Sequence, residues 1–171
     1  MSKVDLLFER HSVRRYLDEK VDPQDIQTIL QAGMSAPSAR NAQPWEFLVI
    51  QDRQRLTECA GIRKFWAMLN EAPLAILVLA NLEGYTGSSR EFFLQDCSAA
   101  AENILLAATA LGYGGVWLGI HALEEPQARL RELFGIPESI VPVMMLPIGR
   151  PLNPPEAKRR FTPEKIHEER Y

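Results

Sequence analysis

The sequence predicts an α+β fold, a layered α/β sandwich in which helices cover a central sheet. Segments of strand length and of helix length intermix along the whole chain. Residues 74–80 form a continuous aliphatic run, typical of a central strand that is covered on both faces. Residues 90–111 have the length of one long helix. The 171 residues show no internal repeat, so we expect a single domain over residues 1–171.

The helix expected after residue 22 has a clear start. Asp22 is a suitable N-cap and Pro23 suits the first helical position. Apolar residues then recur at helical spacing until Pro37 ends the helix. A strand is expected at residues 45–50, and a short helix over residues 52–60.

The next segments are a loop and the long helix. Residues 81–89 are rich in glycine and serine and predict a loop. The helix over residues 90–111 contains runs of alanine, which let another backbone approach closely. We therefore expect it to be the core helix or to lie on a dimer axis.

Beyond the long helix, glycines at positions 112, 114 and 115 break the helical pattern. A strand over residues 116–120, a helix over residues 126–134 and a strand over residues 140–148 are expected to follow. Pro142 and Pro147 in the last strand predict a sheet edge or an irregular end.

Composition excludes several classes of function. The chain is 46% hydrophobic and 24% charged, as in an ordinary soluble protein, and its net charge of −3 gives no basic footprint for nucleic acid. No apolar run approaches the roughly 20 residues that span a bilayer, and no signal peptide is visible, so we expect a cytoplasmic protein without membrane contact. Cys59 and Cys97 are expected to be free buried thiols. Neither a dinucleotide-binding fingerprint, a P-loop nor a metal-ligand cluster is present.

The first candidate binding segment is basic. Arg10 and Arg14 are four residues apart, so they share one face if the N-terminal helix continues through them. Two guanidinium groups there could grip a phosphate or the edge of a heteroaromatic ring. Ser12 adds a hydroxyl and His11 a further donor. The alternative is a solvated basic face.

The second candidate segment, residues 37–45, is a loop between a helix and a strand. Ser38, Asn41 and Gln43 supply neutral hydrogen-bonding side chains, and Pro37 and Pro44 stiffen the loop. The alternative is an ordinary polar turn. No nucleophile–base pair lies nearby, so a bound anionic cofactor is expected to supply the chemistry.

A third basic patch, Lys158 to Arg160, lies in a polar, proline-rich tail over residues 151–171. Such a tail is either disordered or lies across a partner subunit, and its charges alone could be a solvated stretch.

Together these segments resemble the FMN-dependent nitroreductase family, in its short single-domain branch. The resemblance covers nearly the whole chain and is carried by residues 6–14, 36–45, 96–112, 114–119 and 158–164. It implies a nitroreductase-like fold, with a mostly antiparallel sheet flanked by helices. It also implies an intertwined homodimer with shared active sites, in which the tail over residues 151–171 crosses the partner subunit.

The resemblance also implies roles for individual residues. Arg10, His11 and Ser12 would hold the phosphate and ribityl chain of FMN, and Arg14 would lie near N1 and O2 of its ring. The loop residues Pro37, Ser38 and Asn41 would come from the partner subunit, and the backbone of Trp117, Leu118 and Gly119 would face the reactive edge of the ring. Lys158 and Arg160 of the basic tail would close over the phosphate. For Gln43 two roles are open: contact with the flavin, or bracing of its own loop.

The implied function is a ping-pong cycle in which NAD(P)H reduces the flavin at N5 and a nitroaromatic, quinone or similar acceptor reoxidises it, with no catalytic side chain and no metal. Residues 63–66 and 81–89 are expected to shape the acceptor site. One alternative is flavin chemistry on a specific metabolite, such as dehalogenation or dehydrogenation. Another is a flavin-binding redox sensor without efficient turnover. His11 departs from the second arginine of many relatives, which predicts weaker FMN binding above neutral pH.

Overall fold

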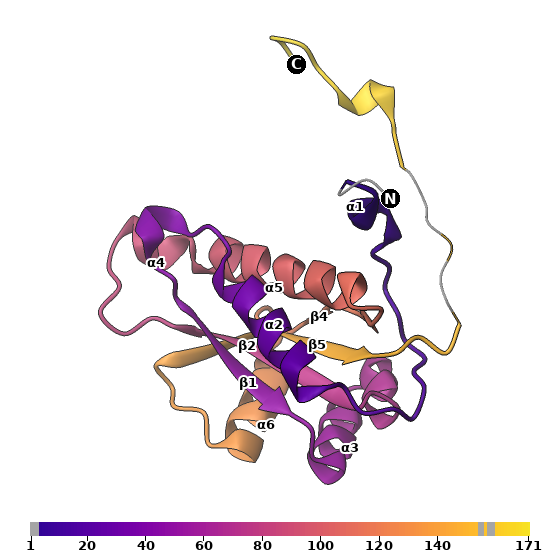
Figure 1. Ribbon diagram of the computed structural model, residues 1–171. Helices are drawn as coiled ribbons and strands as arrows, with labels where there is room; N and C mark the ends of the chain where they lie inside the picture. The colour runs from indigo at the N-terminus through magenta and orange to yellow at the C-terminus, as the bar shows by residue number, and fades with distance from the viewer. Residues whose placement is uncertain (1–3, 154–155, 157–159) are drawn as a thin grey trace.

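A computed structural model describes residues 4–153, 156 and 160–171 (Figure 1). Its centre is a five-stranded antiparallel sheet in the order β1-β2-β5-β3, with β4 also paired to β5. The strands are β1 (Trp45–Ile50), β2 (Leu74–Asn81), β3 (Gly114–Gly115), β4 (Leu118–Gly119) and β5 (Ile140–Gly149). The predicted α+β fold with an antiparallel sheet is confirmed.

Strand β2 is covered on both faces, as its aliphatic run predicts. Ile76 and Val78 belong to a core beneath α2 (Pro23–Met34) and α5 (Phe93–Ala110). Leu77 and Leu79 belong to a second core on the opposite face. That face is covered by α3 (Arg53–Ile62), the 3₁₀ segment η2 (Lys64–Asn70) and α6 (Glu124–Phe134), so helices enclose the sheet from both sides (Figure 1).

The helix starts follow from local chemistry. The Asp22 carboxylate accepts a hydrogen bond from the Gln24 N–H at 2.7 Å, with Pro23 at the first helical position. Asp52 caps α3 by accepting from the Arg55 N–H at 2.9 Å. Helix α5 begins at Phe93 instead of residue 90, because a separate short helix, α4 (Ser88–Glu91), precedes it. Buried alanines make α5 a core helix.

The expected strand over residues 116–120 is shorter, since only Leu118–Gly119 (β4) forms a strand there, and β3 precedes the expected range. Strand β5 lies inside the sheet, so the prediction of a sheet edge is wrong. The Val116 N–H donates to the Pro147 carbonyl at 3.3 Å, but proline has no N–H to return the second bond of such a pair. The ladder therefore breaks between β3 and β4, opposite Pro147. The register shift in β2 falls where it pairs with Pro142, so the predicted irregularity is real.

The N-terminal helix α1 (Asp5–Glu9) stops before the basic segment. Arg10 is already extended, with φ −61° and ψ 122°. The expectation that Arg10 and Arg14 share a helical face is therefore wrong. Residues 10–17, here called the N-terminal arm, run in extended form along the sheet, with Ser12 bridged to Gly115 and Tyr16 to Pro151.

At the other end of the chain, residues 160–171 are exposed and lead away from the body of the fold (Figure 1). They contain one 3₁₀ turn, η3 (Pro163–Lys165). No helix within the described residues is both long enough and apolar enough to cross a membrane. Cys59 and Cys97 are free and buried, as expected, and burial raises the pKa of each thiol to about 12.

Candidate functional site

Packing against two glycines fixes the N-terminal arm. The Val13 N–H donates to the Gly115 carbonyl at 2.9 Å. A Cβ at Gly114 would lie 2.4 Å from Val13 Cγ2, so only glycine allows this approach. The buried Tyr16 hydroxyl donates to the Val13 carbonyl at 2.7 Å, and burial raises its pKa. Val13 and Tyr16 thus anchor the arm while Arg14 stays exposed.

Arg10 and His11 lie where α1 gives way to the arm. The Arg10 Nε atom pairs with Glu102 Oε1 of α5 at 3.1 Å, which leaves most of its five N–H donors available. The His11 Nδ1 atom lies 2.5 Å from the Glu9 carbonyl, so Nδ1 carries a proton and Nε2 is the ring atom left for a ligand.

A cavity of about 560 Å³ opens between the arm, η2 and the segment that joins β3 to β4. It collects Arg14 with Trp117, Leu118 and Gly119, four of the residues predicted for the flavin site. Its other lining residues are Arg63, Lys64, Phe65, Trp66, Ala67, Met68 and Val116. Every charged residue that lines this cavity is basic. We call it the basic cavity.

The loop over residues 37–45 has a strained backbone. Arg40, Asn41 and Gln43 adopt φ values of 54°, 55° and 50°, in the left-handed region that non-glycine residues rarely occupy. Such residues persist only where the surroundings hold them, and they cluster at functional sites. This strain favours a binding role over the alternative of an ordinary turn.

Two side chains from other elements hold this loop. Asp96, at the start of α5, accepts a hydrogen bond from the Ala39 N–H at 2.9 Å. Tyr85 donates its hydroxyl to the Ala42 carbonyl at 2.5 Å. Asp96 is only 5% exposed, and its second oxygen, Oδ2, has no hydrogen-bond partner among the described residues.

Hydrogen bonds within the loop orient the two predicted ligands. Gln43 donates its N–H to Ser38 Oγ at 3.0 Å and its Nε2 to Asn41 Oδ1 at 2.8 Å. The Ser38 hydroxyl proton and the Asn41 Nδ2 group therefore remain to donate elsewhere. Gln43 braces the loop, the second of the two roles considered for it.

The loop and the arm do not meet within one chain. Pro37, Ser38 and Asp96 line a separate cavity of about 380 Å³, and it shares no lining residue with the basic cavity. Of the residues expected to shape the acceptor site, Arg63 to Trp66 line the basic cavity, whereas Leu82 to Thr86 line a third one.

None of the tail residues that the structure describes lines either cavity. Arg160 is exposed, and the predicted ligand Lys158 lies outside the described residues. Across the described part of the chain, no group of three or more His, Cys, Asp or Glu side chains could hold a metal ion.

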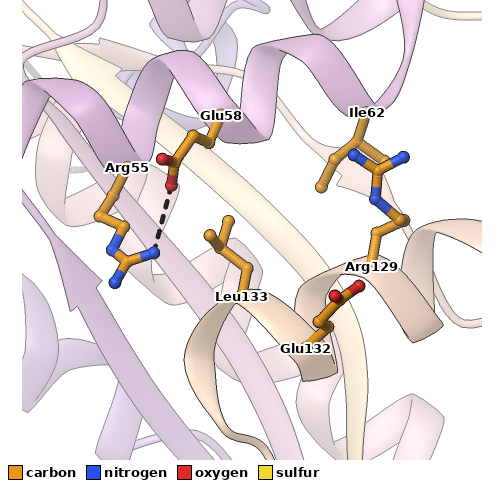
Figure 2. A pocket seen from close by; sticks show the side chains of 6 residues that line it. All are labelled: Arg55, Glu58, Ile62, Arg129, Glu132 and Leu133. Carbon is orange, nitrogen blue, oxygen red and sulfur yellow. Dashed lines mark hydrogen bonds and ion pairs between the residues drawn. The ribbon is translucent and has the colours of Figure 1, made fainter.

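A further cavity, of about 460 Å³, lies between α3 and α6 and has a different character (Figure 2). Its charges are balanced, with Arg55 and Arg129 facing Glu58 and Glu132. Arg55 is already paired with Glu58 at 3.2 Å. This cavity therefore lacks the uncompensated charge that marks the basic cavity.

Two residues that hold the site were missed by the sequence reasoning. Asp96 carried a detectable signal, because it lies four residues before Ala100 and eight before Ile104, on the buried stripe of α5. An acid on such a stripe needs a partner. Tyr85 carried no signal, since its bond to Ala42 joins two loops that are distant in sequence.

Comparisons with known proteins identify the family. A family model described as "Nitroreductase family" matches residues 7–66 and 57–150. The chain belongs to the nitroreductase family and is an oxidoreductase.

Individual relatives match along almost the entire chain. A protein of Archaeoglobus fulgidus named "Putative NADH dehydrogenase/NAD(P)H nitroreductase" is 44% identical over 171 residues, 97% of each chain. An FMN reductase [NAD(P)H] of Bacillus subtilis is 26% identical and aligns with 96% of this chain and 72% of its own length. The solved structure of an FMN-dependent nitroreductase from Clostridium difficile superposes with a TM-score of 0.90 at 26% identity, covering 98% of this chain and 99% of its own.

Proposed function

We propose that this protein is a homodimeric FMN-dependent oxidoreductase that uses NAD(P)H to reduce nitroaromatics, quinones or similar electron-poor acceptors. The observation that carries the proposal is the basic cavity, where Arg14 lies beside the Trp117–Gly119 segment and none of the described lining residues is acidic. Such a cavity suits a planar, anionic cofactor. The names of the relatives, among them an FMN reductase and an FMN-dependent nitroreductase, support the same cofactor.

The arm fits the polar parts of FMN. Ser12 has an exposed hydroxyl, and Arg10 retains free N–H donors beside it, so both suit the phosphate and ribityl chain together with His11. The only hydrogen bond of the Arg14 side chain among the described residues is a long one, 3.5 Å, to the Ser12 carbonyl. Its charge is therefore available to stabilise the negative charge that reduction leaves near N1 and O2 of the ring.

The division of the site between two cavities supports a dimer. We propose that Pro37, Ser38 and Asn41 reach the flavin from a second copy of the chain. The tail over residues 151–171 would cross that copy and bring Lys158 and Arg160 to the phosphate. Phe161 and Ile166 are exposed in the single chain, as expected for a tail that lacks its partner surface. The whole chain would then be one domain, residues 1–171.

When bound, FMN would supply two-electron redox chemistry between NAD(P)H and the acceptor, with hydride transfer at N5. A quinone would take up the hydride equivalent and a proton to become a hydroquinone, and a nitro group would take up two electrons and two protons to become a nitroso group with release of water. The chain itself would bind and orient the reactants: the Trp117–Gly119 backbone would face the ring, and Arg14 would supply the fixed charge. No side chain is needed as an acid or base.

Anaerobic spectroscopy tests the proposal. We expect the FMN-loaded protein to lose its absorbance near ~450 nm with NADH or NADPH and to regain it with a nitroaromatic or quinone. Arg14→Gln should weaken FMN binding about tenfold, while Arg129→Gln, the same change in the balanced cavity of Figure 2, should not. A protein that cannot be loaded with FMN would overturn the proposal. A bound flavin that neither nicotinamide bleaches would favour the redox sensor.

The His11 contact predicts a pH dependence. Because Nδ1 donates to Glu9, a neutral ring presents only the Nε2 lone pair to a phosphate, whereas a protonated ring donates there. We therefore expect FMN binding to weaken as the pH rises. In His11→Arg the positive charge at position 11 is permanent. Any pH dependence of FMN binding that remains in this variant therefore comes from ionisation of the phosphate itself. Identical pH profiles for the two proteins would contradict the prediction.

A further inference from the structure

We infer that Arg63 and Lys64 select planar reactants that carry negative charge. The inference rests on the proposed function, because it concerns what enters the basic cavity once the flavin occupies its part. Arg14 serves the cofactor in that proposal. Arg63 and Lys64 come from a different element, at the junction of α3 and η2, and they line the same cavity.

These two cations have no counterion in the described part of the chain, where neither forms a salt bridge. By contrast, Arg10, Arg15 and Arg150 each pair with a glutamate. With Arg14 added, the described lining of the cavity carries three positive charges and no negative one. Like charges so placed raise the local potential and attract an anion.

The platform that carries the cations is rigid. Trp66 and Leu69 are buried and anchor η2 in the core. The Arg53 guanidinium donates to the carbonyls of Leu69, Asn70 and Ala72, which fixes the far end of the segment. Lys64 is thus the exposed start of an anchored element, and its position relative to the cavity is set by packing.

The same cavity offers aromatic surface. Phe65 is 76% exposed and Trp117 is 37% exposed, although both are large apolar side chains. Exposed aromatic faces at a cavity suit stacking with a planar ring. A flat ring with an attached anionic group would use the aromatic and the cationic lining together.

Two reactants of the proposed cycle have this chemistry. One is the nicotinamide dinucleotide, whose phosphates are anionic. The other is an acceptor with a carboxylate or sulfonate on its ring. Separate measurements of the two half-reactions distinguish them.

The acceptor experiment compares 4-nitrobenzoate with its neutral isostere 4-nitrobenzamide, using the FMN-loaded protein at low ionic strength. The two differ in electron demand, so the diagnostic is the change in their kcat/KM ratio between proteins. We expect Arg63→Gln and Lys64→Gln each to lower the benzoate preference about threefold, and the double variant about tenfold. Arg129→Gln, a matched loss of one exposed charge, should leave the ratio unchanged.

The donor experiment follows anaerobic flavin reduction by NADH, by NADPH and by 1-benzyl-1,4-dihydronicotinamide, which has no phosphate. If the cations bind the dinucleotide phosphates, the same variants lose about threefold per charge with NADH or NADPH and nothing with the benzyl analogue. Salt at 1 M should abolish the difference between the variants and the unaltered protein in either experiment, because it screens exposed charges.

Calorimetric binding of 4-nitrobenzoate and 4-nitrobenzamide to the same proteins gives a readout that needs no turnover. The inference is supported if the protein binds the charged ligand in preference to the neutral one. It is also supported if the variants lose activity selectively with the charged reactant in either kinetic experiment. Equal responses of charged and neutral reactants in all three measurements overturn it, even if the enzyme is active. Selective binding without any flavin reduction would instead leave the inference standing and defeat the proposed function.

Discussion

The N-terminal arm and the loop over residues 37–45 are both expected to contact the flavin, yet they are held in opposite ways. The arm is held by packing and by backbone bonds, with Val13 against Gly114 and Tyr16 buried beneath the sheet end. The loop is held by polar side chains, chiefly Asp96 and Tyr85, against a strained backbone.

These two modes of attachment give the arm and the loop different roles. A packed arm can expose unpaired charge, because its anchors are apolar and insensitive to what Arg14 binds. A strained loop needs hydrogen bonds to fix it, and these same bonds aim Ser38 and Asn41 outward. Substitutions that add or remove a few atoms should therefore affect the two segments by different mechanisms.

The largest expected effect is steric and falls on the arm. Gly114→Ala would place Cβ within 2.4 Å of Val13 Cγ2, and we expect a loss of about 3 kcal/mol in the free energy of unfolding. Val13→Ala in the same chain should restore part of it. The control is Gly61→Ala in α3, where a Cβ meets nothing within 4 Å and about 0.5 kcal/mol of stabilisation is expected. Urea denaturation of the variants would refute the packing argument if Gly114→Ala were neutral.

The next effect is polar and falls on the loop. Asp96→Ala leaves the Ala39 N–H without its acceptor, which should cost about 2 kcal/mol and speed exchange of that amide. Asp96→Asn keeps an oxygen for Ala39 and should cost much less. If Asn proved as costly as Ala in the dimer, Oδ2 would have to accept a hydrogen bond from the second copy.

A smaller effect is expected from the second tie of the loop. Tyr85→Phe removes only the hydroxyl that donates to the Ala42 carbonyl, at a cost of about 1 kcal/mol. Tyr113→Phe is the matched control, since its hydroxyl donates to Asp25 on α2, away from the loop. Both variants should lose similar stability, but only Tyr85→Phe should weaken FMN binding. Equal FMN affinity in the two would show that Tyr85 does not position the loop.

The same contrast explains what the sequence could predict. Local signals sufficed for β2, whose aliphatic run demands burial on both faces, and for the capped starts of α2 and α3. The end of α1 and the break between β3 and β4 depend on tertiary partners. Arg10 turns extended where the arm joins Gly115, and the ladder fails opposite a proline some thirty residues away.

The site divides in the same manner. The residue types and spacings of the arm and loop could be read directly, because charges and prolines are local features. The cavity that joins Lys64 to Arg14 requires segments about fifty residues apart to meet, and no local rule supplies that distance. The sequence reasoning assigned Arg14 to the flavin and residues 63–66 to the acceptor site, but the side chains that share one cavity follow only from the fold.

The smallest effect concerns Glu71, whose carboxylate ties the C-terminal half of the arm. Glu71 accepts from Arg15 at 2.8 Å and from the Tyr16 N–H at 3.3 Å, and the Arg15 hydrogen bond lowers the pKa of Glu71 below its ordinary value. A lowered pKa stabilises the fold above the unfolded-state value, and this contribution is lost as the pH falls through the folded-state value. Because the pair is exposed, we expect Glu71→Gln to cost only about 0.5 kcal/mol at pH 7, with the difference disappearing in acid once the pH falls below the lowered pKa of Glu71. Glu58→Gln breaks a similarly exposed pair on α3 and should leave the Tyr16 amide exchange unchanged. Faster Tyr16 exchange in both variants, or a cost of Glu71→Gln that persists in acid, would mean that the arm does not depend on this charge.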